Sequence, residues 1–159
     1  MANTYSQIHL HVVFAVQNRE SIISKHWKDK LYKYITGIVQ NSGHKMIIIN
    51  GMMDHVHILI GLRPMESVSD LVKKIKRDSS IWINDEKLAR GKFSWQEGYG
   101  VFSYSKSQLP NVIEYIKNQE EHHRGKTFRE EYIRFLELYE VDFDERYIFH
   151  NIDVDTDAG

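Results

Sequence analysis

The sequence predicts an α+β fold in which a single antiparallel sheet has helices on both faces. Several short segments alternate apolar and polar residues with a period of two, which is typical of strands. The segments between them repeat apolar residues at helical spacing. In chain order the elements are strand, helix, strand, strand, helix, strand and two helices. We therefore expect a ferredoxin-like (RRM-like) sandwich with a C-terminal helical extension.

The first half of the chain contains three predicted strands and one helix. Residues 8–16 alternate as a strand with one more apolar face. Residues 25–41 carry apolar residues at helical spacing, and Gly43 lies just beyond the end of this helix. Residues 45–53 and 55–62 are rich in β-branched residues and flank a turn, so we expect them to form an antiparallel hairpin.

The second half contains one strand between helices. Ser67 is the expected cap of a helix with core-facing residues at Val68, Leu71, Val72, Ile75, Ile81, Trp82 and Ile83. A fourth strand is expected over 99–104. The next helix begins at Ser107 or Pro110 and runs to about His122, and the last helix covers 127–139.

The composition fits one compact domain without thiol chemistry. The chain has 159 residues, of which 42% are hydrophobic and none is cysteine. We assign residues 1–149 to a single domain and residues 150–159 to an acidic flexible tail. Without thiolates, a metal ion would need histidine, carboxylate or amide ligands. The sequence contains no targeting segment, membrane-spanning run or Gly-rich nucleotide-binding loop, so we expect a cytoplasmic protein without a nucleotide cofactor.

The net charge of −1 conceals an uneven distribution. Residues 140–159 hold seven of the 22 acidic residues and only one of the 21 basic residues. The rest of the chain is therefore mildly basic, which permits contact with a phosphate backbone. Six residues are candidates for DNA contact, with solvated helix faces as the alternative: Lys73, Lys74, Lys76, Arg77, Arg124 and Lys126.

Two histidines in one predicted strand form a candidate metal site. His55 and His57 are two positions apart, so their side chains leave one face of the strand with their bases about 7 Å apart. Two imidazoles on one face can bind the same ion. The alternative is a pair of exposed polar positions, because Val56 and Ile58 point into the core from the other face.

A tyrosine and a glutamine form the second candidate pair. Tyr115 and Gln119 are four positions apart in a predicted helix and therefore lie on one face of it. Taken alone, the pattern also fits an amphipathic surface helix with a half-buried tyrosine. The pair becomes a candidate site only beside the histidines, because a metal ion and a tyrosine together can act on a phosphodiester.

Other polar residues near these motifs allow two interpretations each. His9 and His11 form a second His-x-His pair, which is either a rival metal site or a packing and DNA-contact pair. Asp54 either orients a histidine or forms the turn before the strand. His122 and His123 are expected to cap a helix, and Trp95 and Gln96 are expected to pack and hydrogen-bond within the fold, with base stacking by Trp95 as the alternative.

The order and spacing of four motifs carry a resemblance to a known family. They are SQIHLHVVFAVQNR near the start, DHVHILI around the paired histidines, WQEGYGVFSYS in the fourth strand and YIKNQ around the tyrosine. With these motifs the chain resembles the single-tyrosine HUH transposases of the smallest bacterial insertion sequences, of TnpA type. Their relatives include the tyrosine transposases associated with repetitive extragenic palindromes. The resemblance covers nearly the whole chain.

The resemblance implies a role for each motif residue. His55, His57 and Gln119 would bind Mg²⁺ or Mn²⁺, and Tyr115 would be the nucleophile that cuts single-stranded DNA. The implied products are a 5′-phosphotyrosine and a free 3′-hydroxyl, which can later be rejoined. The implied partners are DNA hairpins and a second copy of the chain, in a homodimer whose active sites can be shared in trans through a hinge at residues 106–109.

Two functions from other classes remain as alternatives. One is a DNA-hairpin-binding relative that has lost transposition. The other is a metal-dependent phosphoesterase that uses water, with Tyr115 as a structural residue.

Overall fold

The computed structural model describes residues 4–122 and 125–152. The strands are β1 (His9–Ala15), β2 (Lys45–Gly51), β3 (His55–Gly61) and β4 (Gly100–Tyr104). The α-helices are α1 (Lys28–Asn41), α2 (Val68–Asp85), α3 (Leu109–Lys117), α4 (Gln119–His122) and α5 (Phe128–Leu138). Three 3₁₀ turns complete the described part: η1 (Arg19–Ser21), η2 (Lys106–Gln108) and η3 (Glu145–Tyr147).

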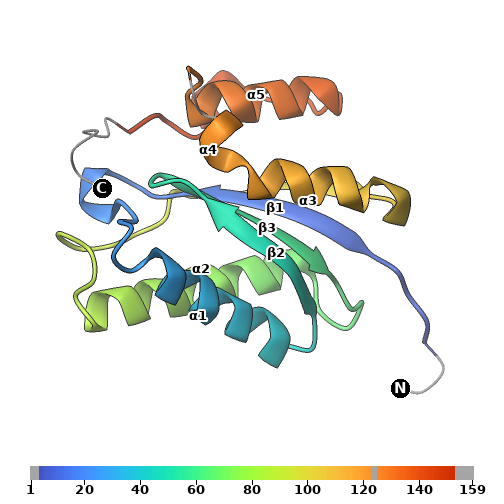
Figure 1. The fold of residues 1–159 in the computed structure, drawn as a ribbon, viewed down its shortest axis with the longest axis horizontal. Helices are drawn as coiled ribbons and strands as arrows, with labels where there is room; N and C mark the ends of the chain where they lie inside the picture. The colour runs from blue at the N-terminus through green and yellow to red at the C-terminus, as the bar shows by residue number, and fades with distance from the viewer. Residues whose placement is uncertain (1–3, 123–124, 153–159) are drawn as a thin grey trace.

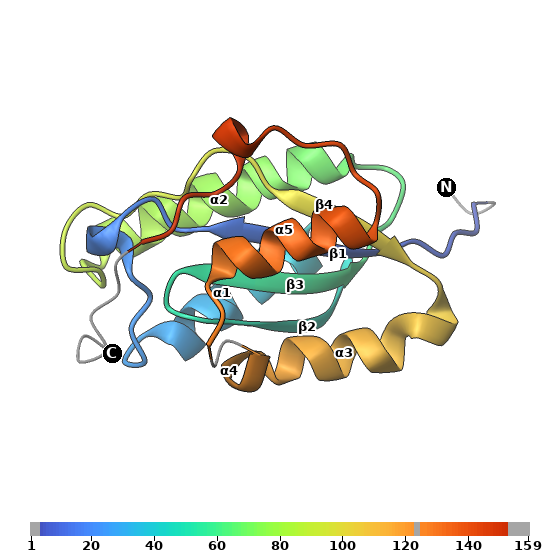
Figure 2. The ribbon, with the colours of Figure 1, turned by 90° about the horizontal axis from the view of Figure 1, so that it is seen from above.

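The sheet confirms the predicted α+β class. Its strand order is β2-β3-β1-β4, and every neighbouring pair is antiparallel. Helices α1 and α2 cover one face, while α3, α4 and α5 lie over the other, as Figure 1 shows from the side and Figure 2 from above. This is the ferredoxin-like arrangement with a helical extension that the element order predicted.

The main core lies between the sheet and helices α1 and α2. Because side chains alternate across a strand, Val12 and Phe14 of β1 and Val56 and Ile58 of β3 all point to this face. Buried residues of α1 and α2 meet them: Leu31, Ile35, Val39, Leu71, Val72, Ile75 and Ile83. Burial of this kind is the dominant stabilising contribution to a fold of this size.

The second face is covered by two smaller apolar clusters. Helix α3 packs on β2 and β3 through Val112 and Ile116. Helix α5 packs through Phe128 and Tyr132 on β1 and β4. Helix α5 lies close to β4, since a Cβ added to Gly100 would lie 2.6 Å from the hydroxyl oxygen of Tyr132. Polar side chains at the centre of this face, those of His11, His55 and His57, are therefore buried.

Two sequence expectations need correction. Ile81 was expected in the core but is 54% exposed, because the buried face of α2 passes through Leu71, Ile75, Ser79 and Ile83 at four-residue steps. The helix expected to run to about His122 is interrupted at Asn118, which separates α3 from α4. Elsewhere the observed boundaries differ from the predicted ones by at most three residues, which is usual for helix and strand ends.

The C-terminal part of the described chain lies against the body. Phe149 is buried, and the His150 imidazole lies 2.7 Å from the backbone oxygen of Gln17. Most of the predicted tail, residues 153–159, lies outside the described residues, so the boundary at residue 149 stays a prediction. Within the part that the structure describes, no helix is long and apolar enough to cross a membrane.

Candidate active site

His55 and His57 lie on the central strand β3 and point toward α3, α4 and α5. Both imidazoles are fully buried, since the helices that follow β4 cover this face of the sheet. The alternative of two exposed polar positions is therefore wrong. Buried polar groups need partners, so each ring nitrogen of His55 and His57 should contact another polar atom.

One nitrogen of each imidazole contacts an orienting residue. The Nδ1 of His55 lies 2.7 Å from a carboxylate oxygen of Asp54, which accepts its hydrogen. The Nδ1 of His57 lies 2.7 Å from the Nε2 of His11 on β1. Burial, and next the neighbouring His57, lower the pKa of His11 well below its usual value, so His11 is neutral and can accept a hydrogen bond. In this arrangement both Nε2 atoms direct their lone pairs toward the space below α5.

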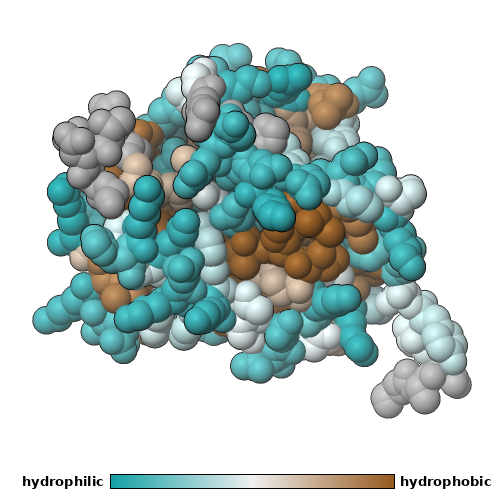
Figure 3. Space-filling view, in the orientation of Figure 1, coloured by the Kyte–Doolittle hydropathy of each residue, from teal (hydrophilic) through white to brown (hydrophobic). Residues whose placement is uncertain are grey.

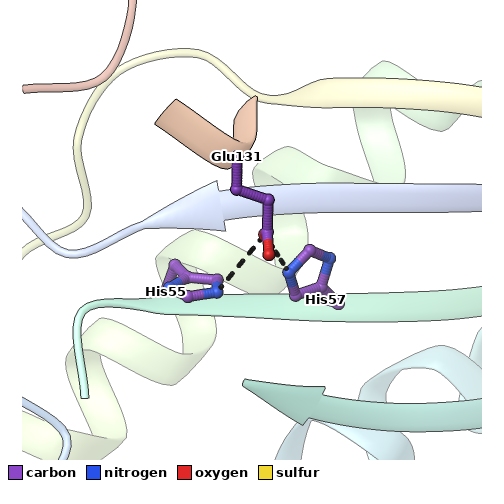
Figure 4. A group of neighbouring side chains, drawn as sticks. All are labelled: His55, His57 and Glu131. Atoms are coloured by element: carbon purple, nitrogen blue, oxygen red, sulfur yellow. Dashed lines mark hydrogen bonds and ion pairs between the residues drawn. The ribbon is translucent and has the colours of Figure 1, made fainter. Parts of the chain in front are cut away.

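Glu131 of α5 lies in that space and was missed by the sequence analysis. Its Oε1 atom is 3.0 Å from the Nε2 of His57 and 3.9 Å from the Nε2 of His55. Figure 4 shows the carboxylate pointing from α5 toward both imidazoles. The potential ligand atoms of these three buried residues all lie within 4.8 Å of one another, so the group can hold a metal ion.

Gln119 completes the group from the start of α4. Its side chain is fully buried, and its Oε1 lies 3.0 Å from the Nε2 of His55. The break at Asn118 aims this residue inward, and Asn50 of β2 accounts for the break. Its amide donates to the carbonyl oxygens of Ile116 and Lys117, which a continuous helix would use for its own hydrogen bonds.

Tyr115 lies beside the histidines at the end of α3. Its ring centroid is 6.0 Å from that of His57 in the same chain, and its side chain is half-buried. Burial, and next the charge and hydrogen bond of Glu131, raise the pKa of the Tyr115 hydroxyl, whereas a hydrogen bond with Gln119 acts in the opposite direction. The structure thus brings together all four residues that the sequence analysis assigned to the centre and adds Glu131.

The donor set fits a divalent cation. With each Nδ1 used as above, four acceptor atoms face one another: the Nε2 atoms of His55 and His57 and the side-chain oxygens of Gln119 and Glu131. Acceptors repel unless protons or a cation lie between them. Imidazole, amide and carboxylate ligands are shared by Mn²⁺, Mg²⁺ and Zn²⁺ sites, so the set fits such an ion without selecting one.

The predicted basic cluster lies on α2, across the sheet from the histidines. Two of its four members hold other parts of the chain, because Lys74 pairs with Glu66 at 3.0 Å and Lys76 donates to the backbone oxygens of Gln96 and Gly98. Arg77 pairs with the adjacent Asp78 at 2.9 Å, and Lys73 is exposed.

The two remaining DNA-contact candidates follow α4. Lys126 lines a hollow next to Tyr115. Arg124 lies outside the described residues, as does His123.

The remaining candidates have structural roles. Trp95 is buried and donates to the Ser79 hydroxyl at 3.0 Å, so its expected packing role is confirmed. Gln96 donates to the backbone oxygen of Val16 at 2.9 Å. His11 joins the site as an orienting residue, whereas His9 pairs with Gly61 at the far end of β3 from His55. The choice of the His-x-His pair on β3 agrees with this geometry.

Comparisons with known proteins agree with these observations. Residues 4–119 match the family model described as "Transposase IS200 like". The chain is 26% identical over 119 residues to the ISDra2 transposase TnpA of Deinococcus radiodurans, an alignment that covers 71% of this chain and 84% of that protein.

Two solved structures share the fold. A crystal structure of a candidate transposase from Deinococcus radiodurans has a TM-score of 0.58 at 22% identity, over 75% of this chain and 95% of that one. A REP-associated tyrosine transposase bound to a REP hairpin has a TM-score of 0.53 at 14% identity, over 73% of this chain and 68% of that one.

The sheet, its paired histidines and the tyrosine helix therefore define a transposase of the single-tyrosine, TnpA type. The chain belongs to the IS200-like transposase family, because the family model matches residues 4–119 of its 159 residues. Helix α5 and Glu131 lie beyond the matched residues.

Proposed function

We propose that this transposase cuts and rejoins single-stranded DNA through a covalent bond between Tyr115 and a 5′-phosphate. The observation that carries the proposal is the convergence of His55, His57, Gln119 and Glu131 on one centre beside the tyrosine. A nucleophile next to a candidate metal site is the arrangement that phosphodiester transfer needs.

In the proposed reaction the hydroxyl oxygen of Tyr115 forms a bond to the phosphorus. The bond from phosphorus to the 3′-oxygen breaks, and the upstream strand leaves with a 3′-hydroxyl. The proton that the Tyr115 hydroxyl loses balances the one that the 3′-oxygen gains. The downstream strand stays on Tyr115 through its 5′-phosphate. The reverse reaction rejoins a 3′-hydroxyl without ATP, because the energy of the phosphodiester is kept in the phosphotyrosine.

The side chains around Tyr115 position the reacting groups. Glu131 and Gln119 hydrogen-bond with the tyrosine hydroxyl, so they hold it at the metal-binding centre. A divalent ion bound there, for which we propose Mg²⁺ or Mn²⁺, supplies positive charge that stabilises the phosphate and the ionised tyrosine. Asp54 and His11 hold the imidazoles in the orientation that such an ion requires.

DNA hairpins are the proposed recognition element. The solved relative bound to a REP hairpin supports this assignment, and the proposed DNA contacts are Lys73, Lys74, Lys76, Arg77, Arg124 and Lys126. Because Lys74, Lys76 and Arg77 are engaged with other groups, Lys73 is the stronger candidate on α2. Lys126 is a candidate because of its place beside Tyr115.

A homodimer is also part of the proposal. Strand β2 is at the edge of the sheet, and Figure 3 shows apolar side chains gathered over it in the middle of one face. An uncovered apolar edge favours pairing with a second copy. Tyr115 lies beside His57 of its own chain, so a single chain also brings the catalytic residues together.

A mixing experiment distinguishes active sites that are shared between two subunits from active sites that are each built within one chain. Tyr115→Phe and His57→Ala subunits are each expected to be inactive. The mixture regains activity if α3 crosses between subunits by a movement at η2, and it stays inactive if each site is built within one chain.

The proposed reaction is tested by incubating the protein with labelled hairpin-containing single-stranded DNA and Mg²⁺ or Mn²⁺. The wild type should form a covalent adduct that resists denaturation, and Tyr115→Phe should form none. A phosphoesterase would cut in both proteins without an adduct. A hairpin-binding relative would bind without cutting.

A further inference from the structure

A hollow of about 300 Å³ opens beside Tyr115 on the side of α5. It is lined by Tyr115, Lys126, Glu131, Arg134, Phe135 and Leu138. Its volume is at the lower end of the range for small-ligand sites, which is roughly 300–1,000 Å³. Every α5 residue that lines it lies beyond the part of the chain that matches the family model.

Arg134 gives this hollow an available positive charge. The side chain is exposed and forms no hydrogen bond or ion pair within residues 4–122 and 125–152. Arg129 on the same helix differs, because it donates to the backbone oxygens of Glu145 and Phe149 at 3.0 and 2.9 Å. A guanidinium without a protein partner can bind a phosphate through two parallel hydrogen bonds.

The wall of the hollow is apolar and aromatic. The ring of Phe135 meets that of Tyr115 edge to face, with the centroids 5.3 Å apart. Leu138 is 68% exposed at the same opening, one helical turn beyond Arg134. Nucleic-acid sites of this kind combine a cation for the backbone with aromatic or apolar side chains for the base.

The two charged residues of α5 that line the hollow, Glu131 and Arg134, lie at different depths. Glu131 points inward, with its carboxylate 3.0 Å from the Nε2 of His57. Arg134 is exposed at the solvent side, one turn along the same face of α5. A phosphate next to the reacting one would therefore meet Arg134 rather than Glu131.

We propose that this hollow binds the nucleotide that flanks the scissile phosphate, with its phosphate on Arg134 and its base against Phe135 and Leu138. Lys126 lines the same hollow and adds a second positive charge near the bound DNA. The inference rests on the proposed cleavage of single-stranded DNA and adds a specific nucleotide site to it. It makes α5 part of the substrate site of this chain.

The test compares Arg134→Gln with Arg90→Gln, both in the Tyr115→Phe protein, so that no adduct forms. Arg90 is a matched control, because it is exposed, forms no side-chain hydrogen bond or ion pair with the described residues and follows α2 on the other side of the sheet. The probe is a fluorescein-labelled single-stranded oligodeoxynucleotide of randomised sequence, titrated at several salt concentrations. Anisotropy then gives the Kd and its salt dependence.

Arg134→Gln should raise the Kd about tenfold and reduce the slope of log K against log salt by about 0.7, the value of one lost phosphate contact to a single strand. Arg134→Lys should restore the slope but only part of the affinity, since lysine cannot make the paired hydrogen bonds. Arg90→Gln should leave both quantities close to those of the parent.

The base contact has a separate readout. Leu138→Asn should weaken binding of the intact probe but not of a probe made entirely of abasic nucleotides.

The proposal is overturned if Arg134→Gln matches Arg90→Gln in affinity and slope, or if only its melting temperature changes. These binding measurements do not need cleavage. A wild type that forms no phosphotyrosine would therefore contradict the proposed reaction. The conclusion on Arg134 would still follow from the binding measurements alone.

Discussion

Glu131→Gln is the substitution that tests the composition of the metal-binding centre. The change keeps the size of the side chain and one oxygen but removes the negative charge that lies 3.0 Å from His57 and 3.9 Å from His55. The remaining donors, two imidazoles and one amide, are all neutral. We therefore expect Mn²⁺ to bind more weakly while the metal-free protein keeps its fold.

The size of the effect follows from general values. Loss of a residue that only supports a ligand weakens metal binding by about 10–100-fold, and a charged ligand should cost at least as much. That factor corresponds to about 1.4–2.7 kcal/mol. At saturating metal the same amount of stabilisation is lost, which for a chain of this length lowers the metal-induced increase in Tm by about 3–11 °C.

Thermal unfolding with and without MnCl₂ measures this effect. Glu130→Gln is the matched control, because Glu130 is the adjacent exposed residue of α5. Electron paramagnetic resonance of Mn²⁺ gives the affinity independently. Should Glu131→Gln keep the full Mn²⁺-induced increase in Tm, the assignment of Glu131 to the centre would be refuted.

Three further predictions concern two residues near the site and one on α2. Asp54→Asn should weaken Mn²⁺ binding by about 10–100-fold, measured by the same resonance titration, because the carboxylate that orients His55 is lost; unchanged affinity would show that Asp54 only forms the turn. Asn50→Ala should lower the free energy of unfolding by about 1–3 kcal/mol in urea, since two carbonyl oxygens at the end of α3 lose their donor; an equal urea midpoint would contradict this. Burial lowers the pKa of Lys76 to about 8, so the unfolded chain binds more protons between about pH 8 and 10.5 and this residue makes stability rise with pH in that window. Urea unfolding of wild type and Lys76→Met should therefore diverge there, and parallel pH profiles would refute the shift.

The fold was largely predictable because its signals are local. Alternation in 8–16, β-branched residues in 55–62 and the Ser67 cap each depend on neighbours within one element, and the structure confirms these elements. Ile81 was misplaced because three apolar residues in a row conceal which one faces the core. The interruption at Asn118 depends on Asn50, 68 positions earlier in the chain, so no local pattern in the helix could show it.

Only those residues of the site that share one element or one motif could be predicted from the sequence. His55 and His57 share a strand face, and Tyr115 and Gln119 belong to one motif. Glu131 comes from another helix, 74 positions after His57. One signal for it was present, since Glu131 follows Phe128 by three positions and precedes Phe135 by four, which puts a carboxylate in the apolar stripe of α5.

The most direct test of the account is to locate the covalent bond to DNA. The wild type is incubated with single-stranded DNA that contains a hairpin and with Mn²⁺, digested with protease and nuclease, and analysed by peptide mass spectrometry. We expect a nucleotide joined through its 5′-phosphate to the peptide that contains Tyr115 of the wild type, and none in His57→Ala. Cleaved DNA with an unmodified Tyr115 peptide, or a nucleotide on another tyrosine such as Tyr104, would contradict it.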